Sequence, residues 1–309
     1  MPTYTGNSPN LTVAANLKQP VRISRDLASL ATKRFIADKI FQKGTPQEVA
    51  GGSMVYEKSE SIYLERDVEE IAERGVWPRT GWSEQLFQEF VRQYGLEVPI
   101  SNLAIRRNQR SRLITAQIKL ANMLVKLVDT KAMALLTTVT GGVQTMGASA
   151  LWTNVATKIA SDIAAAQEMI DILDEGEFGT TLILNPRRRD DLLNNDQLAA
   201  RLPRENGITA IQRGEQAPFM GLQDILYTNQ IAIDKAVLVV PKAAGVIADE
   251  RPDPEEGFVA YQPAGADFAP IWTQVYDEKP AKDKILSAGR WPAMALLEPR
   301  FVVVITGVA

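Results

Sequence analysis

The sequence contains no cysteine and no histidine. Disulfides, thiolate metal sites and Cys nucleophiles are therefore excluded, as are His general bases and His-ligated zinc. The sequence also has no amino-terminal apolar segment flanked by basic residues, and no run approaches the ~18 apolar residues of a membrane span. We expect a protein that is not an enzyme, with no catalytic residue, metal site, cofactor or membrane partner, and one that folds in the cytosol of the cell that makes it.

The remaining composition is that of an ordinary soluble globular protein. Its 309 residues are 45% hydrophobic and 23% charged, which is enough for one large core or two ordinary ones. The 34 basic and 37 acidic residues give a net charge of −3. This balance is not typical of a general nucleic-acid-binding protein.

The longest regular pattern runs from Ser101 to Thr140, and no proline or glycine occurs between Pro99 and Gly141. Apolar residues recur there at steps of three, four or multiples of a turn, which predicts one long helix with a continuous apolar stripe. They are Ile105, Ile114, Ile118, Ala121, Val125, Val128, Ala132, Leu135 and Val139. At ~1.5 Å per residue, ~35 residues span on the order of 50 Å, which suits an extended, plate-like subunit.

The two halves of this predicted helix differ in character. Four arginines surround its first turns: Arg106, Arg107, Arg110 and Arg112. The later half, Leu120 to Leu136, is apolar on more than one face, and we expect it to be buried. The basic end is expected to meet solvent, nucleic acid or an acidic partner surface.

The segments before the helix suggest an arm and a hairpin. Residues 1–20 are rich in proline and asparagine, which favours an irregular arm or a disordered tail, and Ser24 is expected to cap a short helix. A strand-like run, Met54 to Leu64, leads out, and a second strand returns to Val98.

Acidic residues dominate the part of the chain between these two strands. Glu57, Glu60, Glu65, Asp67, Glu69, Glu70 and Glu73 outnumber Lys58, Arg66 and Arg74. A hairpin with so little apolar surface cannot build its own core. Two interpretations remain open: an exposed, solvated hairpin, or a hairpin that lies on another surface.

The remainder of the chain predicts an α/β lobe followed by a β segment. The lobe, Gly142 to Asp249, holds a helix from about Trp152 to Leu173, strands at Thr180–Leu184, Ile225–Tyr227, Val237–Val240 and Val246–Ile247, and a helix started by Asn185 and Pro186. After Arg251, strands are expected at Phe258–Tyr261, Ile271–Tyr276 and Phe301–Thr306, packed on the long helix.

The stretch Gly142 to Ser149 comes within one residue of a phosphate-binding loop, but Ala148 replaces its lysine and the stretch follows a helix, so we do not expect a nucleotide site.

The order of these elements resembles the major capsid proteins of tailed bacteriophages, which have the Hong Kong 97-like fold. The resemblance covers nearly the whole chain and includes the strand ending Val98-Pro99-Ile100-Ser101 that runs straight into the helix. Phe35 to Ile40, and Val237 to Pro241 with Gly245 to Ile247, also look like that family. The implied fold class is α+β.

The resemblance implies a division of the chain and a function. The expected parts are an N-terminal arm at 1–43, an extended loop at 44–98, a spine helix at 99–141, an axial domain at 142–250 and a peripheral β segment at 251–309. The implied function is that of a structural major capsid protein whose hexamers and pentamers form an icosahedral shell around double-stranded DNA, contacted non-specifically. Further implied partners are a portal and separate scaffolding or decoration proteins, and the implied location is the virion, assembled in the bacterial cytoplasm.

Two alternatives remain. An encapsulin-type compartment shares the fold and encloses protein cargo, and a soluble α/β enzyme would have to work with Ser, Lys, Tyr or carboxylates only. In the prototype of the family, an extended-loop lysine forms an isopeptide bond with an asparagine of the neighbouring subunit. Lys58 would supply the amine here, but residues 251–309 contain no asparagine, so we expect a shell without covalent links.

The charge pattern predicts which residues join neighbouring subunits, because opposite potentials fix the register of an interface. The predicted contact residues are Glu57, Lys58, Glu65, Arg66, Asp67, Glu69, Glu70 and Arg74 in the loop, and Arg106, Arg107, Arg110 and Arg112 at the start of the helix.

Overall fold

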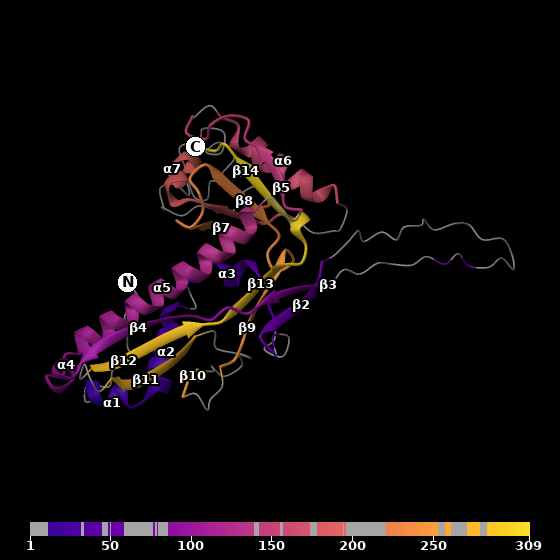
Figure 1. Cartoon of the computed structure of the whole chain (residues 1–309). Coiled ribbons are helices and arrows are strands. Elements are labelled where there is room, and N and C mark those ends of the chain that lie inside the picture. Colours follow the sequence, from indigo (N-terminus) through magenta and orange to yellow (C-terminus); the bar gives the residue numbers. More distant parts are fainter. Residues whose placement is uncertain are drawn as a thin grey trace, which may run out of the picture. The chain divides into compact units, whose positions relative to one another are not determined.

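The computed structural model describes residues 12–31, 34–44, 49, 51–58, 77, 79, 86–138, 142–154, 157–173, 178–193, 195, 221–252, 257–260, 271–278 and 283–309. The chain divides into two compact units, whose elements are labelled in Figure 1. Unit 1 comprises Met1–Met54, Phe90–Leu135 and Ile247–Met294, and unit 2 comprises Val55–Glu89, Leu136–Val246 and Ala295–Ala309. Each unit is therefore built from segments far apart in the sequence.

A four-stranded antiparallel sheet forms the body of unit 1, in the order β10-β11-β12-β4. Its strands are β4 (Tyr94–Ser101), β10 (Val259–Ala260), β11 (Trp272–Glu278) and β12 (Asp283–Arg290). Helix α2 (Pro20–Ala31) packs on β10 and β11, as Figure 1 shows. The buried Ser24 hydroxyl donates to the Ile271 carbonyl at 3.3 Å, so this helix is tied to the sheet by polar as well as apolar contacts.

The amino-terminal part of unit 1 is more helical than the sequence predicts. Residues expected to form an irregular arm include α1 (Val13–Leu17), whose first turn is capped by the Thr12 hydroxyl. The next helix, α2, begins at Pro20, so Ser24 lies inside it and is not its cap. Proline suits a first helical turn because it has no N–H to leave unsatisfied there. A short helix, α3 (Ala37–Ile40), follows.

The prediction of one unbroken helix from Ser101 to Thr140 is wrong. The structure has α4 (Asn102–Arg106), capped by Ser101, and then α5 (Arg110–Thr137), the long magenta helix in Figure 1. Asn108 separates them with a φ of 51°, and its Oδ1 accepts the Val13 N–H at 2.8 Å. Asparagine tolerates this left-handed conformation better than other side-chain-bearing residues, so a corner forms where periodicity alone continues the helix.

Helix α5 is also less buried than its apolar sequence predicts. Leu120, Leu124, Val128 and Leu136 are buried, as expected. Met123, however, is 50% exposed, and Lys126 and Lys131 also face solvent. One face of α5 is therefore open in the isolated subunit.

A five-stranded mixed sheet forms the body of unit 2, in the order β5-β14-β8-β6-β7. Its strands are β5 (Gln144–Gly147), β6 (Thr181–Leu184), β7 (Asp224–Tyr227), β8 (Lys235–Val239) and β14 (Val302–Thr306). Helix α6 (Ile159–Asp171) contacts β14 and β8. As predicted, Asn185 caps a helical segment, which consists of η2 (Pro186–Arg188) and α7 (Arg189–Leu193).

Several strands differ from the sequence-based expectation. The stretch compared with a phosphate-binding loop contains the extended strand β5, and β14 lies in the sheet of unit 2 between β5 and β8. Strands β12 and β13 (Pro292–Leu296) were not predicted. A further three-stranded sheet has the order β1-β9-β13, with β1 at Gln42–Lys43 and β9 at Gly245–Asp249. The short 3-10 turn η4 (Pro299–Phe301) precedes β14.

Two glycines on paired strands of unit 1 provide a matched test of its packing. A Cβ on Gly289 would lie 2.2 Å from Trp272 Cζ2 and 2.6 Å from the Tyr94 carbonyl oxygen. A Cβ on the opposing Gly95 would meet nothing closer than 3.4 Å. The Trp272 ring is held by Trp291, at 5.2 Å between centroids, and by Phe258 at 4.3 Å, so it cannot easily move aside.

We expect Gly289→Ala to lower the free energy of unfolding of the subunit by about 3 kcal/mol, because the new methyl group overpacks the Trp272 site. Gly95→Ala should cost less than about 1 kcal/mol. Urea unfolding of unassembled subunits, followed by tryptophan fluorescence, compares the two. Equal losses of unfolding free energy in Gly289→Ala and Gly95→Ala would show that Trp272 does not occupy the space above Gly289.

Candidate inter-subunit surface

The β2–β3 ribbon has one aromatic face. Strands β2 (Ser53–Glu57) and β3 (Leu86–Phe90) pair as a two-stranded sheet. Tyr56 stacks on Phe87 with 5.9 Å between ring centroids, and Lys58 Nζ lies 4.6 Å from the centroid of Phe87. Partial burial, together with the nearby Glu89 carboxylate, raises the pKa of Tyr56 above its usual value. This face of the ribbon is therefore packed within the chain.

The opposite face of the ribbon is open and largely apolar. Side chains alternate along a strand, so Val55 and Glu57 point away from Tyr56, and Leu86, Gln88 and Phe90 point away from Phe87. Val55 is 57% exposed, Leu86 67% and Phe90 62%. Large apolar side chains gathered on one face are typical of a surface that binds another molecule. We call these five residues the ribbon face.

The structure places only some of the predicted loop residues. Glu57 is exposed on the ribbon face, and Lys58 is half-buried above Phe87. The other predicted loop contacts, Glu65, Arg66, Asp67, Glu69, Glu70 and Arg74, lie outside the described residues. The charge pairing between loop and helix remains a prediction.

The predicted arginines lie around the corner between α4 and α5 and differ in accessibility. Arg106, Arg107 and Arg112 are exposed, whereas Arg110 is half-buried and already has an interaction partner within the chain. Arg106 is in the last turn of α4, where a cation complements the helix dipole. Arg106, Arg107 and Arg112 are therefore accessible to a partner, and the first two are neighbours at the end of α4.

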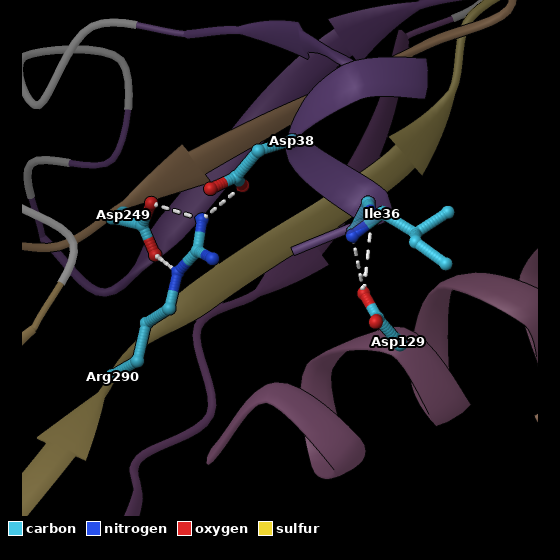
Figure 2. Close-up of polar contacts among 6 residues, drawn as sticks. Ile36, Asp38, Asp129, Asp249 and Arg290 are labelled. Carbon is cyan, nitrogen blue, oxygen red and sulfur yellow. Dashed lines mark hydrogen bonds and ion pairs between the residues drawn. The ribbon is translucent and has the colours of Figure 1, made fainter. Parts of the chain in front are cut away.

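A buried polar cluster in unit 1, drawn in Figure 2, is not indicated by any local pattern in the sequence. Arg290 at the end of β12 donates to both Asp249 carboxylate oxygens, at 2.7 and 2.8 Å, and to Asp38 Oδ1 at 2.8 Å. Its guanidinium carbon also lies 4.6 Å from the Phe35 ring centroid. One side chain thus joins α3, β9 and β12.

The charges in this cluster are set by burial and by their partners. Burial raises the pKa of Asp249, and Arg290 opposes that rise. Burial alone would lower the pKa of Arg290, but Asp249 and Asp38 raise it on balance, so it stays cationic. The cation is needed because a buried carboxylate without a partner costs several kcal/mol, on the order of 3–5 when a pair is broken.

Asp129 forms a second buried link, also shown in Figure 2. It lies on α5, is 4% exposed, and its Oδ1 accepts the N–H groups of Ile36 and Ala37 at 3.0 and 3.1 Å. The pKa of Asp129 is raised to about 6 on balance: burial raises it most, the N–H groups of Ala37 and Ile36 lower it, Asp38 raises it and Arg290 lowers it. The signal in the sequence is that Asp129 is the only acidic residue of α5.

A model of the phage capsid protein family matches residues 88–305, from within β3 to within β14. The chain belongs to the phage capsid protein family. No curated protein sequence matches this capsid protein. Among its described residues, no helix is long and apolar enough to cross a membrane, and no group of three or more acidic side chains is arranged to hold a metal ion.

The fold of the capsid protein is similar to that of solved phage and virus-like-particle structures at low sequence identity. The chain from Microbacterium phage Oxtober96 gives a TM-score of 0.60 at 13% identity, covering 88% of this chain and 90% of that one. The capsid of Cyanophage P-SCSP1u gives 0.58 at 13%, covering 87% and 86%. The virus-like particle from Pyrococcus furiosus gives 0.57 at 15%, covering 92% and 98%. The predicted α+β Hong Kong 97-like fold and the predicted phage major capsid protein are confirmed.

The raised pKa of Asp129 predicts a pH-dependent stability. The folded chain holds this proton more tightly than the unfolded chain, whose Asp titrates near 4. The stabilisation of the folded chain by this proton is complete below the unfolded pKa of about 4 and is lost as the pH rises through the folded pKa of about 6. The loss corresponds to a penalty of about 2–3 kcal/mol at pH 8.

Asp129→Asn keeps an acceptor for Ile36 and Ala37 without the charge. We therefore expect its free energy of unfolding, relative to the unmodified chain, to rise by about 2 kcal/mol between pH 4.5 and pH 8. Urea unfolding at the two pH values measures this difference. The same substitution at the exposed Asp171 is the matched control, and an Asp129→Asn effect that does not change with pH would contradict the assignment.

Proposed function

We propose that copies of this chain assemble as hexamers and pentamers into an icosahedral shell that encloses the double-stranded DNA genome of a tailed bacteriophage. The observation that carries the proposal is the ribbon face, with Val55, Leu86 and Phe90 exposed in a chain of the phage capsid protein family. A two-stranded ribbon cannot supply a second layer to cover such a face. A neighbouring copy can.

The energetics favour apolar burial as the main source of cohesion and charge as the source of register. Burying one large apolar side chain contributes roughly 1.5–3 kcal/mol, whereas an exposed ion pair contributes under about 1 kcal/mol. Arg106 and Arg107 of one copy would face the acidic loop of the next. Such contacts are weak singly and become effective when they are repeated over a closed lattice.

The same proposal includes the other components of the particle. We infer a portal at one vertex, separate scaffolding or decoration proteins, and non-specific contact between the shell and packaged DNA. Assembly would take place in the cytoplasm of the bacterial host.

A second candidate is an encapsulin-type compartment with protein cargo. The observation that favours it is the similarity to the virus-like particle from Pyrococcus furiosus, which extends over 98% of that chain. The contents of purified particles distinguish the two candidates, since a viral shell holds nucleic acid and a compartment holds enzymes.

The assembly proposal predicts closed shells when the purified chain is concentrated and viewed by electron microscopy. Arg106→Glu/Arg107→Glu should leave the subunit folded, by circular dichroism, but reduce the yield of closed shells at least tenfold, because it places negative charge against the acidic loop. Arg106→Lys/Arg107→Lys keeps the charge and should assemble. Normal particle yield from the Glu variant would refute the proposed contact.

The absence of asparagine from residues 251–309 predicts a shell without covalent links. Assembled particles, dissolved and run on a denaturing gel, should give one band of monomer size. A ladder of linked subunits that disappears in Lys58→Arg would show instead that Lys58 forms a bond with a different partner residue.

A further inference from the structure

The exposed charged residues of α5 are all cations. Arg112, Lys119, Lys126 and Lys131 are all exposed. The only acidic residue of the helix, Asp129, is 4% exposed and is bound to the backbone of Ile36 and Ala37. No carboxylate of α5 therefore offsets these cations, although the whole chain carries a net charge of −3.

Three of the cations follow one line along the helix. Arg112, Lys119 and Lys126 are seven residues apart, which is close to two helical turns. Seven residues rise ~10.5 Å, and the position around the axis drifts by only ~20°. The three side chains therefore stand in a straight row about 21 Å long on the exposed face.

Arg34 adds a positive charge to this row from another part of unit 1. Its side chain is exposed, and Nη1 donates to Asn122 Oδ1 on α5. Asn122 is three residues after Lys119 and four before Lys126, so it shares their face. We call Arg34, Arg112, Lys119, Lys126 and Lys131 the basic row; Lys131, five residues after Lys126, lies ~140° around the axis from the line of the other three helix cations.

The basic row is not neutralised within the described part of the chain, where none of its five members forms an ion pair. A set of uncompensated cations at regular spacing is suited to a partner with regularly spaced negative charge. The double helix carries one phosphate per ~1.7 Å of its axis.

The chemistry of the face favours nucleic acid over a protein partner. Three of its five cations are lysines, which are depleted in the cores of protein interfaces, and α5 contains no aromatic residue. Thr115 and Asn122 lie exposed between the cations and can donate to phosphate oxygens. The lack of aromatic side chains gives no platform for unstacked bases, so the duplex is favoured over a single strand.

We propose that the basic row binds the phosphate backbone of double-stranded DNA without sequence preference. The proposal rests on the proposed function, because it assigns the genome-facing contact of the shell to the exposed surface of α5. It is separate from the proposed subunit contact at Arg106 and Arg107.

The test measures binding of the full-length unassembled subunit to a fluorescent 30-base-pair duplex of random sequence between about 25 and 200 mM salt. Lys119→Gln/Lys126→Gln/Lys131→Gln should weaken binding at least tenfold at the lowest salt. It should also reduce the slope of log affinity against log salt by about 2–3, because each phosphate contact contributes ~0.9. Arginine at the same three positions should restore both the affinity at the lowest salt and the slope of log affinity against log salt.

The matched control removes three exposed lysines from other places, as Lys18→Gln/Lys158→Gln/Lys242→Gln, and should retain the slope. The proposal is overturned if the unmodified subunit does not bind the duplex, or if both glutamine variants lose affinity equally. It is also overturned if the α5 variant binds DNA normally but no longer forms shells, since the row would then be a protein contact. Failure of the unmodified chain to form shells would instead refute the proposed function.

Discussion

A two-stranded ribbon has two faces and no third strand or covering layer of its own, so β2 and β3 can bury only the side on which Tyr56 stacks on Phe87. The other side leaves Val55, Leu86 and Phe90 more than half exposed. In a solitary protein such a face is a liability for aggregation, whereas in a shell protein it has a use. The same surface that fails to complete one subunit can complete the next, and assembly then supplies the apolar burial that the single chain lacks.

Unit 1 is held together by buried polar links as well as by apolar packing. Arg290 joins Asp38 and Asp249, which are 211 residues apart in the sequence, and Asp129 holds the N–H groups at the start of α3. Apolar packing is tolerant of small shifts, but a bidentate guanidinium and carboxylate pair has one good geometry. These links therefore fix the register of α3, β9 and β12 more than they add to the net free energy of folding.

Sequence patterns indicated the order of the elements because periodicity is a local property. Local residue patterns are enough to indicate the strands at Thr181–Leu184 and Asp224–Tyr227 and the helix start at Asn185 and Pro186. The corner at Asn108 could not be predicted in this way, because a single left-handed residue interrupts an apolar pattern that continues on both sides of it. Strand β12 was also missed: its sequence mixes charged, small and apolar residues, and its burial depends on β4 and β11. For the candidate sites, the sequence predicts that the hairpin cannot build its own core. It does not predict the cluster of Arg290, Asp38 and Asp249, because only the tertiary fold brings these three residues together.

Helix α5 shows how one element can serve both the subunit and the particle. Its inner side, with Leu120, Leu124 and Val128, fixes it to the subunit. Its outer side carries like charges at Arg112, Lys119 and Lys126, and two such rows would repel each other if they met. The repulsion would also burden a shell in which many copies bring these rows close together. Under the proposed DNA contact, a polyanion inside the shell would relieve this repulsion, and filling with DNA would then stabilise the particle through the same lysines.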